Sequence, residues 1–356
     1  MKRLFALLMA LVMVFGLVAC GGNSAPAATE APKADAPATE APATEAPATE
    51  APAADALTFK VAYAETADSI FGQVINAAFE EITAKTEGRL VFEIFPGNQL
   101  GSITDVLEQQ VAGAPLICSM GFDNLGDVVP AFAPASFPYV FNDLYEVQAL
   151  AKSEWIANIE AQLVEKDIQP LCYGAIGYRH FISTFEINSA ADCAGHIMRM
   201  GPSGAAQGFI TVMNGTPTTS TWADNYSLLQ TGVIESCEAP LSLLMSSSLG
   251  EVCDYLALSG HFVNPFSLTM NPMFWEMISA EDQAIVKDTL AAACVEMADQ
   301  AMAMEAEYVE QFKAQGVTVT EPDKSTFNAV VPALFELLEL DPAIYDDIRA
   351  AIDANK

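Results

Sequence analysis

Beyond the first 56 residues, the apolar positions of the chain follow two alternating periods. A period of two, typical of a half-buried strand, covers Leu57–Ala64 and returns in Leu90–Phe95. Helical spacing of apolar residues predicts helices over Phe71–Thr86 and Ile103–Val111, and the apolar run Pro115–Met120 follows. This alternation predicts an α/β fold with a mainly parallel sheet and helices on both faces. Ligands of such sheets bind at the carboxyl ends of the strands.

The pattern continues to the end of the chain, with one segment much longer than the others. The remaining predicted elements are helix 144–166, strand 169–175, helix 203–213, helix 224–230, strand 232–238, strand 317–320 and helix 325–355. Ala280–Gln315 has helical character and no proline over its whole length. A helix of that length has to span more than one domain or bend.

The N-terminal residues have the composition of an export signal and a tether. Lys2 and Arg3 precede an apolar run that is too short to span a membrane, so residues 1–20 are predicted to be a secretory signal. Leu17–Gly21 resembles a bacterial lipobox, which predicts lipid modification of Cys20 and an extracytoplasmic, membrane-anchored protein. An ordinary signal with a chance cysteine is the alternative. Residues 21–56 repeat Ala, Pro, Thr and Glu, a composition that predicts a disordered spacer.

The charge of the chain excludes some partners. The full sequence has a formal net charge of −31, and residues 57–356 hold 40 acidic against 12 basic residues, a net −28. Nucleic acid and anionic membrane surfaces are poor partners for such a body. An anionic small ligand needs locally focused positive charge, which directs attention to the few arginines.

Cysteine and histidine spacing indicates neither a metal site nor a catalytic centre. The six cysteines beyond Cys20 form no CxxC pair and have mostly apolar neighbours, so buried free thiols are expected, although export permits disulfides. They are Cys118, Cys172, Cys193, Cys237, Cys253 and Cys294. The three histidines are scattered, and no Gly-x-Ser-x-Gly elbow is present. We therefore expect no cofactor, no metal and no enzymatic activity, and an exported hydrolase is a less favoured alternative.

Two arginines stand out between Gly177 and Pro240. After the signal only four arginines remain, and Arg179 and Arg199 lie in short strand-like runs among apolar residues rather than on a polar helix face. A guanidinium in such a place needs an anion, and its planar fork fits a carboxylate held by two hydrogen bonds. The alternatives are internal: a salt bridge of Arg199 to Glu235 or Glu238, and an ion pair of Arg179 at a domain hinge.

Six motifs in order resemble one family. The segments are Thr86–Leu90, Phe95–Gly101, Phe137–Phe141, Ala191–Arg199, Tyr226–Glu235 and Glu238–Pro240. They are similar to T-x-G-R, Y-P-x-x-Q-L-G, P-Y-x-F, A-D-L-K-G-L-K-I-R, Y-x-A-L-Q-x-G-V-V-D and E-x-P of the DctP-type substrate-binding proteins of tripartite ATP-independent periplasmic (TRAP) transporters. The resemblance covers roughly Leu57 to Gly316.

The resemblance implies a fold, a division into domains and a function. It implies a two-domain clamshell like that of periplasmic binding proteins, with a long helix spanning both domains. Domain I is expected over 57–176 plus about 265–304, and domain II over 177–264 plus about 305–356. The implied function is capture of a small organic acid and its delivery to TRAP membrane subunits. A sensor subunit that presents its occupied form to a receptor has the same fold and site, and stays an alternative.

The resemblance also implies site residues. The arginine of K-I-R pairs with the ligand carboxylate in the family, which points to Arg199, and Arg179 holds the place of a second cationic contact. Trp222, which could instead be core, stands where a large apolar residue flanks the ligand. Asn124 and Ser203 are placed beside the cleft by loop position, and Ser69 more weakly by the loop after the first strand.

Two departures from the family bear on the ligand. Ala239 stands where many members have asparagine, and Asn124 stands where sialic-acid-binding members have arginine. Both departures weaken the case for sialic acid. A dicarboxylate, a 2-oxo acid, a sugar acid and an aromatic acid all stay open.

Overall fold

The computed structural model describes residues 56–356. The predicted signal peptide, the lipobox with Cys20 and all but the last residue of the predicted tether lie outside these residues. Within the described part, no helix combines the length and the apolar character that crossing a membrane requires.

Three parallel strands and two helices form the first part of the fold. They are β1 (Leu57–Ala62), α1 (Ile70–Lys85), β2 (Leu90–Phe95), α2 (Ile103–Val111) and β3 (Leu116–Gly121). The helices begin where a serine can satisfy free backbone N–H groups: Ser69 caps α1, and Ser102 forms a capping box with Asp105 in α2. The predicted apolar face of α1 is buried, so the pattern-based assignments of this part are confirmed.

A helical segment then leads to a long strand. Its elements are α3 (Phe122–Val128), the 3-10 helix η1 (Pro130–Ser136), α4 (Glu146–Ala151), α5 (Glu154–Val164) and β4 (Gln169–Ser183). The single helix predicted over 144–166 is wrong, because the chain breaks at Lys152 and Ser153. Ser153 starts α5 as its cap, accepting a hydrogen bond from the N–H of Ile156 at 3.2 Å.

Short elements make up the second part of the sheet and its cover. They are η2 (Ala190–Cys193), β5 (Ile197–Arg199), α6 (Gly204–Val212), β6 (Thr216–Thr218), η3 (Trp222–Asp224), α7 (Asn225–Gln230), β7 (Ser236–Pro240), α8 (Leu241–Ser246), η4 (Leu249–Glu251), β8 (Tyr255–Met270) and α9 (Pro272–Trp275). The strand β8 lies in a range for which the sequence pattern predicted none.

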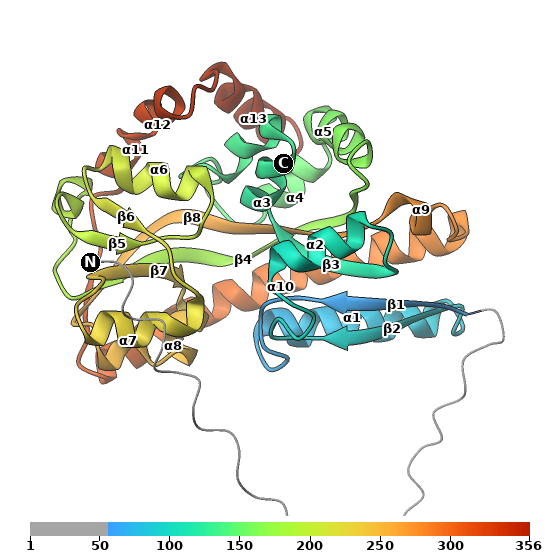
Figure 1. The fold of residues 1–356 in the computed structure, drawn as a ribbon, viewed down its shortest axis with the longest axis horizontal. Helices are drawn as coiled ribbons and strands as arrows, with labels where there is room; N and C mark the ends of the chain where they lie inside the picture. The colour runs from blue at the N-terminus through green and yellow to red at the C-terminus, as the bar shows by residue number, and fades with distance from the viewer. Residues whose placement is uncertain (1–55) are drawn as a thin grey trace, which may run out of the picture. The chain divides into compact units, whose positions relative to one another are not determined.

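The strands form one sheet in the order β2-β1-β3-β8-β4-β7-β5-β6, with β9 (Thr318–Thr320) beside β8 (Figure 1). The β1–β2, β1–β3, β5–β6 and β5–β7 pairs are parallel, as predicted. The centre differs, because β4 and β8 pair with each other in antiparallel fashion along most of their lengths and join the two parallel groups. Their register shifts between Ala175 and Tyr178, an irregularity that lets a strand bend.

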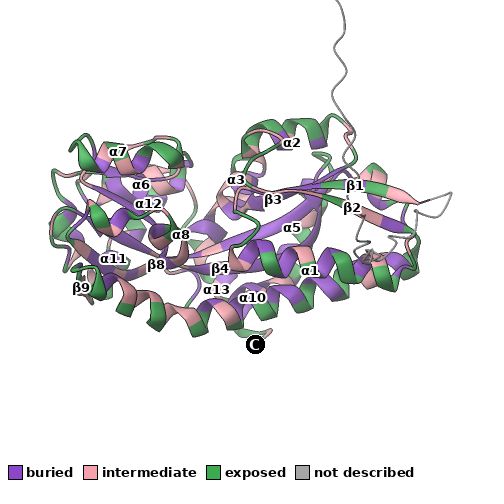
Figure 2. Cartoon of the chain, turned by 90° about the horizontal axis from the view of Figure 1, so that it is seen from below, coloured by how far each residue is buried: buried purple, intermediate pink, exposed green. Residues whose placement is uncertain are grey.

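The long helix is α10 (Ala280–Ala314), 35 residues that pack on α1 and β4 and, further along, on α8 and β9. It runs beneath both parallel groups of strands, as Figure 2 shows. The prediction that this segment spans more than one part of the fold is confirmed. Its buried residues are mostly apolar, whereas the exposed face is mostly polar with Val295 and Met302 as apolar exceptions.

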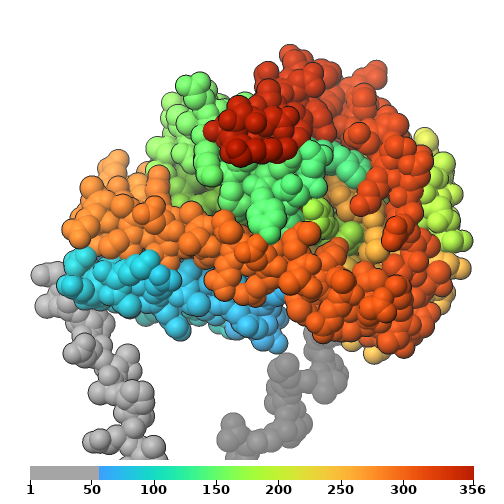
Figure 3. All heavy atoms as spheres, turned by 180° about the vertical axis from the view of Figure 1, so that it is seen from behind, coloured from blue at the N-terminus to red at the C-terminus, as the bar shows by residue number. Residues whose placement is uncertain are grey.

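The C-terminal residues return across the molecule. The single helix predicted over 325–355 is wrong: the chain forms α11 (Lys324–Asn328), α12 (Val331–Leu337) and α13 (Ala343–Asp353). Helix α12 packs on α6, whereas α13 packs on α4, α5 and η1. Figure 3 shows these residues in red, lying over the green segment that includes α4 and α5.

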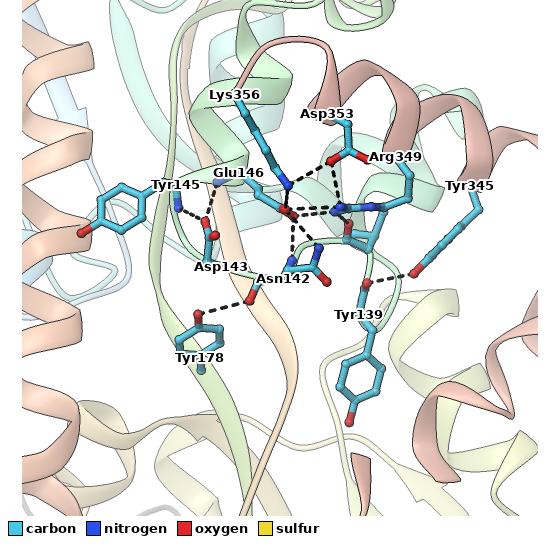
Figure 4. A network of polar contacts seen from close by, with 11 residues as sticks. Tyr139, Asn142, Asp143, Tyr145, Glu146, Tyr178, Tyr345, Arg349, Asp353 and Lys356 are labelled. Carbon is cyan, nitrogen blue, oxygen red and sulfur yellow. Dashed lines mark hydrogen bonds and ion pairs between the residues drawn. The ribbon is translucent and has the colours of Figure 1, made fainter. Parts of the chain in front are cut away.

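A buried carboxylate fastens α13 in place (Figure 4). Glu146, 2% exposed, accepts hydrogen bonds from Arg349, from Lys356 Nζ at 2.7 Å and from the backbone N–H of Asn142 at 2.7 Å. Tyr345 donates its hydroxyl to the carbonyl oxygen of Tyr139 at 2.8 Å. Every charge here is met by a partner within the chain.

The core lies on both faces of the sheet, and the cysteines belong to it. All six cysteines of the described residues are buried free thiols in the structure. Burial raises the pKa of Cys118, Cys193 and Cys253 to about 12, so these thiols stay protonated at neutral pH.

Candidate functional site

A cavity of about 680 Å³ opens where the two parallel groups of strands face each other. Its walls come from the carboxyl ends of β1, β3, β5 and β7 and from the middle of β4 and β8. Loops at the carboxyl ends of parallel strands are where ligands of α/β sheets bind, and the strand directions of this fold bring four such ends together. Residues 65, 124, 199 and 262 are all part of its wall, although they lie far apart in the sequence.

Arg199 is the last residue of β5 and is 8% exposed. Its Nη2 donates to the carbonyl oxygen of Ser220 at 2.8 Å, and its Nε has no hydrogen-bond partner within residues 56–356. The guanidinium carbon lies 5.5 Å from the ring centroid of Trp222, within range of a cation–π contact. Burial lowers the pKa of Arg199, and the nearby charge of Glu238 offsets this only in part. Arg199 thus lines the cavity, and its Nε–H donor is not used by any described protein group.

Arg199 does not form either of the internal salt bridges considered from the sequence. Glu235 accepts hydrogen bonds from His196 Nδ1 at 3.0 Å and from the N–H of Ile197 at 2.9 Å. Glu238 is engaged by Arg179. Neither carboxylate forms an ion pair with Arg199 in the described residues.

Arg179 has the opposite surroundings. It lies on β4 between Pro240 of β7 and Phe262 of β8, and both neighbouring strands supply acceptors. Its Nε and Nη2 hold the carboxylate of Glu238, with Nη2 to Oε1 at 2.7 Å, and Nη1 donates to Asn264 Oδ1 at 3.1 Å. This is the internal ion pair that was the alternative for Arg179, although its side chain still lines the cavity.

Glu238 is 1% exposed and is held as a carboxylate by its neighbours. Burial alone would raise its pKa, but the charge and hydrogen bonds of Arg179, with a smaller effect of His261, hold the pKa of Glu238 at about 2. The ring of His261 stacks on Phe181, with centroids 4.1 Å apart, and burial lowers the pKa of His261 to about 4. Arg179 and Glu238 therefore form a neutral pair that joins the central strands.

The other predicted site residues divide into two groups. Trp222, Asn124 and Ser203 line the cavity beside Arg199 and Arg179, so five of the six predicted residues are brought together. Trp222 Nε1 donates to Ser247 Oγ at 2.9 Å, which fixes the ring, and Ser203 caps α6. Ser69 is not part of the cavity wall: its hydroxyl caps α1, accepting from the N–H of Gly72 at 3.0 Å.

The polar residues of the cavity wall that sequence reasoning missed include Glu65, Asp123 and Asn264. Burial raises the pKa of both carboxyls, and the charge of Arg179 opposes this only partly. Glu65 lies three residues beyond β1 and Asp123 two residues beyond β3. The rule that ligands bind at the carboxyl ends of strands would have pointed to both acids. Asn264 lies on β8, the strand that the pattern did not predict.

Most of the chain matches one known protein family. The profile of the bacterial extracellular solute-binding proteins, family 7 (DctP), matches residues 61–339. The chain belongs to this family. Its members are substrate-binding transport proteins rather than enzymes, and the relatives named SiaP and DctP are periplasmic proteins. The recognition of a TRAP substrate-binding protein from six motifs is confirmed.

Relatives of this chain include two proteins matched by sequence and one solved structure. A solute-binding protein of Roseobacter denitrificans is 28% identical over 253 residues, 70% of this chain and 77% of that protein. The C4-dicarboxylate-binding periplasmic protein DctP of Rhodobacter capsulatus is 25% identical over 227 residues, 63% of this chain and 67% of that protein. The crystal structure of a TRAP periplasmic solute-binding protein of Actinobacillus succinogenes with bound L-galactonate is 26% identical. It matches with a TM-score of 0.78 over 83% of this chain and 99% of that chain, which confirms the α/β binding-protein fold.

Proposed function

We propose that this family 7 protein is an extracytoplasmic lipoprotein that captures a small organic acid and delivers it to TRAP membrane subunits. In this proposal the carboxylate of the acid binds Arg199, and the ring of Trp222 flanks it. Arg179, Asn124 and Ser203 complete the wall, with Arg179 adding positive potential while it keeps Glu238.

The observation that carries the proposal is that Arg199 is buried without an anionic partner in the described residues. Arg199 is 8% exposed as a residue and thus largely removed from water, yet its guanidinium makes one hydrogen bond to the protein and leaves Nε without a partner in the described residues. Buried charged groups in proteins are normally paired, because leaving one unpaired is costly. A ligand carboxylate supplies both the charge and the acceptors that this side chain lacks.

Closure of two domains around the ligand is part of the proposal. The cavity wall includes Glu65 and Asn124 from one parallel group of strands and Arg199 and Trp222 from the other. Within residues 56–356 the chain passes between the two groups along β4, β8, α10 and the C-terminal helices, and β4 is irregular between Ala175 and Tyr178. We place the hinge at this irregularity, since small changes of backbone angle there would move the two groups of cavity residues together.

A screen of organic acids by thermal unfolding tests the proposal. An acid present at a hundred times its dissociation constant should stabilise the protein by about 2.7 kcal/mol. We expect at least one monocarboxylate to raise the melting temperature of the wild-type body, to leave that of Arg199→Ala unchanged, and to be recovered chemically intact. A panel of dicarboxylates, 2-oxo acids, sugar acids, aromatic acids and amino acids that produces no shift would contradict the proposal. Conversion of the acid into a product would favour an enzyme instead.

The anchor is tested separately. Because the proposed tether has no part in the binding site, Cys20→Ala should yield a soluble protein with unchanged ligand affinity. Fractionation of cells and calorimetry of the purified variant give the two readouts. A variant that stays with the membrane, or that loses affinity, would show that the division into anchor, spacer and binding body is incorrect.

A further inference from the structure

Two acidic side chains face the cavity from the group of strands that does not hold Arg199. Glu65 follows β1 and Asp123 is the second residue of α3, which starts directly after β3, and both belong to the cavity wall. Strands β1 and β3 are parallel neighbours in register at Ala62 and Cys118, so their following loops leave the same edge of the sheet. The two carboxyl groups therefore enter the cavity from adjacent strands.

Neither acid has a cationic partner of its own. Within residues 56–356 neither Glu65 nor Asp123 takes part in an ion pair. The Oε2 of Glu65 is buried and has no hydrogen-bond partner there. The cation whose charge reaches both acids is Arg179, and its guanidinium is already held by Glu238 and Asn264. Both acids thus lack an ion pair within the described residues, and Glu65 also lacks a hydrogen-bond partner at Oε2.

The charges of the cavity constrain the far end of the ligand as well as its carboxylate. Arg179 and Glu238 cancel, and a ligand carboxylate cancels Arg199, so no charge is left within the described residues to compensate Glu65 and Asp123 in their ionised forms. A second ligand carboxylate near them would add like charge in a poorly hydrated place, which is costly. A hydroxyl can donate a hydrogen bond but brings no charge. A protonated amine brings both, with three donors on one atom.

The distance between the two parts of the site sets the separation of the ligand's charged groups. Strands β3 and β5 are four positions apart in the sheet, so their backbones lie on the order of 19 Å from each other at about 4.8 Å per strand. Side chains bridge part of this distance from both sides. An α-amino acid, with both charges on one carbon, cannot reach the two parts together.

We propose that the ligand is a zwitterion, an inference that rests on the proposed function. Its carboxylate binds Arg199, and its protonated amine, several bonds away, binds Glu65 and Asp123. An ω-amino acid or an amino-sugar acid has this form. The polar residues Asn124 and Asn264 of the wall then serve the uncharged middle of the ligand.

Two matched sets of acids test this inference by calorimetry. One set is 6-aminohexanoate, 6-hydroxyhexanoate and hexanedioate, and the other is 6-amino-6-deoxygluconate, gluconate and glucarate. Within each set only the far end changes, from ammonium to hydroxyl to carboxylate. We expect the amino member of at least one set to bind about tenfold or more tightly than the hydroxy member, and the diacid to bind most weakly.

Substitutions of the two acids test whether they are the groups that bind the ammonium. Glu65→Gln and Asp123→Asn should each lower the ratio of the affinities for the amino and the hydroxy member, which is the quantity compared among variants. Asp127→Asn is the matched control, because Asp127 is an exposed acid on the same helix as Asp123 and is not part of the cavity wall. It should keep the full preference.

The outcomes separate this inference from the proposed function. If hydroxy members or diacids bind the wild type as tightly as the amino members, or if no amino member binds while other acids from the thermal screen do, the zwitterion inference is overturned and the proposed function stands. If no acid of either experiment binds, the proposed function itself is wrong. A preference that survives in both Glu65→Gln and Asp123→Asn would also overturn the inference, because the ammonium would then bind elsewhere.

Discussion

Two arginines in different regions of this molecule are largely withdrawn from solvent, Arg199 as a buried and Arg349 as a partly buried residue, and their partners differ. Beneath α13, Arg349 meets the carboxylate of Glu146, the carbonyl oxygen of Val140 and Asp353 (Figure 4). In the cavity, Arg199 makes one hydrogen bond to a carbonyl oxygen and leaves its Nε without a partner in the described residues. The first region is electrostatically complete without a ligand, and the second is not.

The difference distinguishes a structural charge from a binding charge. A complete network contributes to the folded state whether or not a ligand is present, so its loss should appear as lower stability. In an incomplete network, a buried charge has lost its hydration without gaining an ionic partner in the protein. Its removal should therefore lower ligand affinity with little or no loss of stability. Four predictions test this contrast, from the largest effect to the smallest.

The largest expected effect is on ligand affinity in Arg199→Ala. Truncating one partner of a buried charged pair costs about 2 to 5 kcal/mol, which is roughly thirty-fold to several-thousand-fold in affinity. Arg199→Lys should fall between alanine and wild type, because lysine keeps the charge and loses the planar fork. Calorimetry with the acid selected by the thermal screen measures the affinity. The melting temperature of the ligand-free variants should not fall, and a clear fall with normal affinity would assign Arg199 to the structural class.

The next effect is on stability in Arg349→Ala, the matched variant from the complete network. It leaves the carboxylate of Glu146, 2% exposed, with Lys356 as its remaining cation. We expect the free energy of unfolding to fall by about 1 to 3 kcal/mol, measured by denaturant titration. Ligand affinity per folded molecule should match wild type. A loss of affinity comparable to that of Arg199→Ala would remove the contrast between the two regions.

A smaller effect appears only at acid pH. Burial by itself would raise the pKa of Glu146, but hydrogen bonds from Arg349, Lys356 and Asn142 hold it at about 2, below its ordinary value of 4.5. Because the folded pKa is lowered, the contribution of Glu146 to stability is complete above about pH 4.5 and is lost as the pH falls towards 2. The stability difference between wild type and Glu146→Gln should therefore shrink over that window. A difference that stays constant from pH 6 to pH 2 would mean that Glu146 is not held as a carboxylate.

The smallest effect separates two helix caps. Ser69→Ala removes the cap of α1 outside the cavity, and Ser203→Ala removes the cap of α6 on the cavity wall. Each should cost about 1 kcal/mol of stability. Only Ser203→Ala should also weaken ligand binding, if its hydroxyl reaches the ligand. A measurable affinity loss in Ser69→Ala would restore Ser69 as a site residue.

Local periodicity predicted the elements whose partners are close in sequence. The strands β1 to β3 and the helices α1 and α2 follow from alternation and capping residues, and Ala280–Gln315 was recognised as one long helix. The strand β8 was missed, because Gly260 and Pro265 interrupt it and both residues normally argue against a strand. It forms because β3, β4 and β9 pair with it along its length, and this tertiary support is invisible in its own sequence.

The C-terminal helices were predicted as one because two local signals were passed over. Pro332 stands in the first turn of α12 and Pro342 directly before α13, and a proline inside a helical pattern normally marks a helix boundary. The chain has to leave α6 and cross to α4, so α12 and α13 are separate helices with different partners. The direction of such a crossing depends on contacts such as Arg349 with Glu146, which are 203 residues apart.

For the site, the sequence identified the unusual residues and missed the ordinary ones. Arg179 and Arg199 stood out because arginine is rare in this acidic chain and because they lay in apolar strands. Glu65 and Asp123 are two acids among 46, so nothing in composition separates them from surface residues. Only the fold shows that they face a cavity without cationic partners. The distinction between Arg179, which has an internal carboxylate, and Arg199, which does not, likewise depends on the geometry of β7.

The most direct test of the central claim observes the guanidinium of Arg199 itself. Without the signal peptide the chain has four arginines, so the ¹Hε–¹⁵Nε resonances in solution NMR are few and can be assigned with single variants. On saturation with the acid selected by the thermal screen, the account predicts a large downfield shift of the Arg199 Hε, as this N–H gains a carboxylate acceptor, while the Arg349 resonance stays in place. An Arg199 resonance that does not move in the saturated protein would contradict the assignment of Arg199 as the ligand-binding residue.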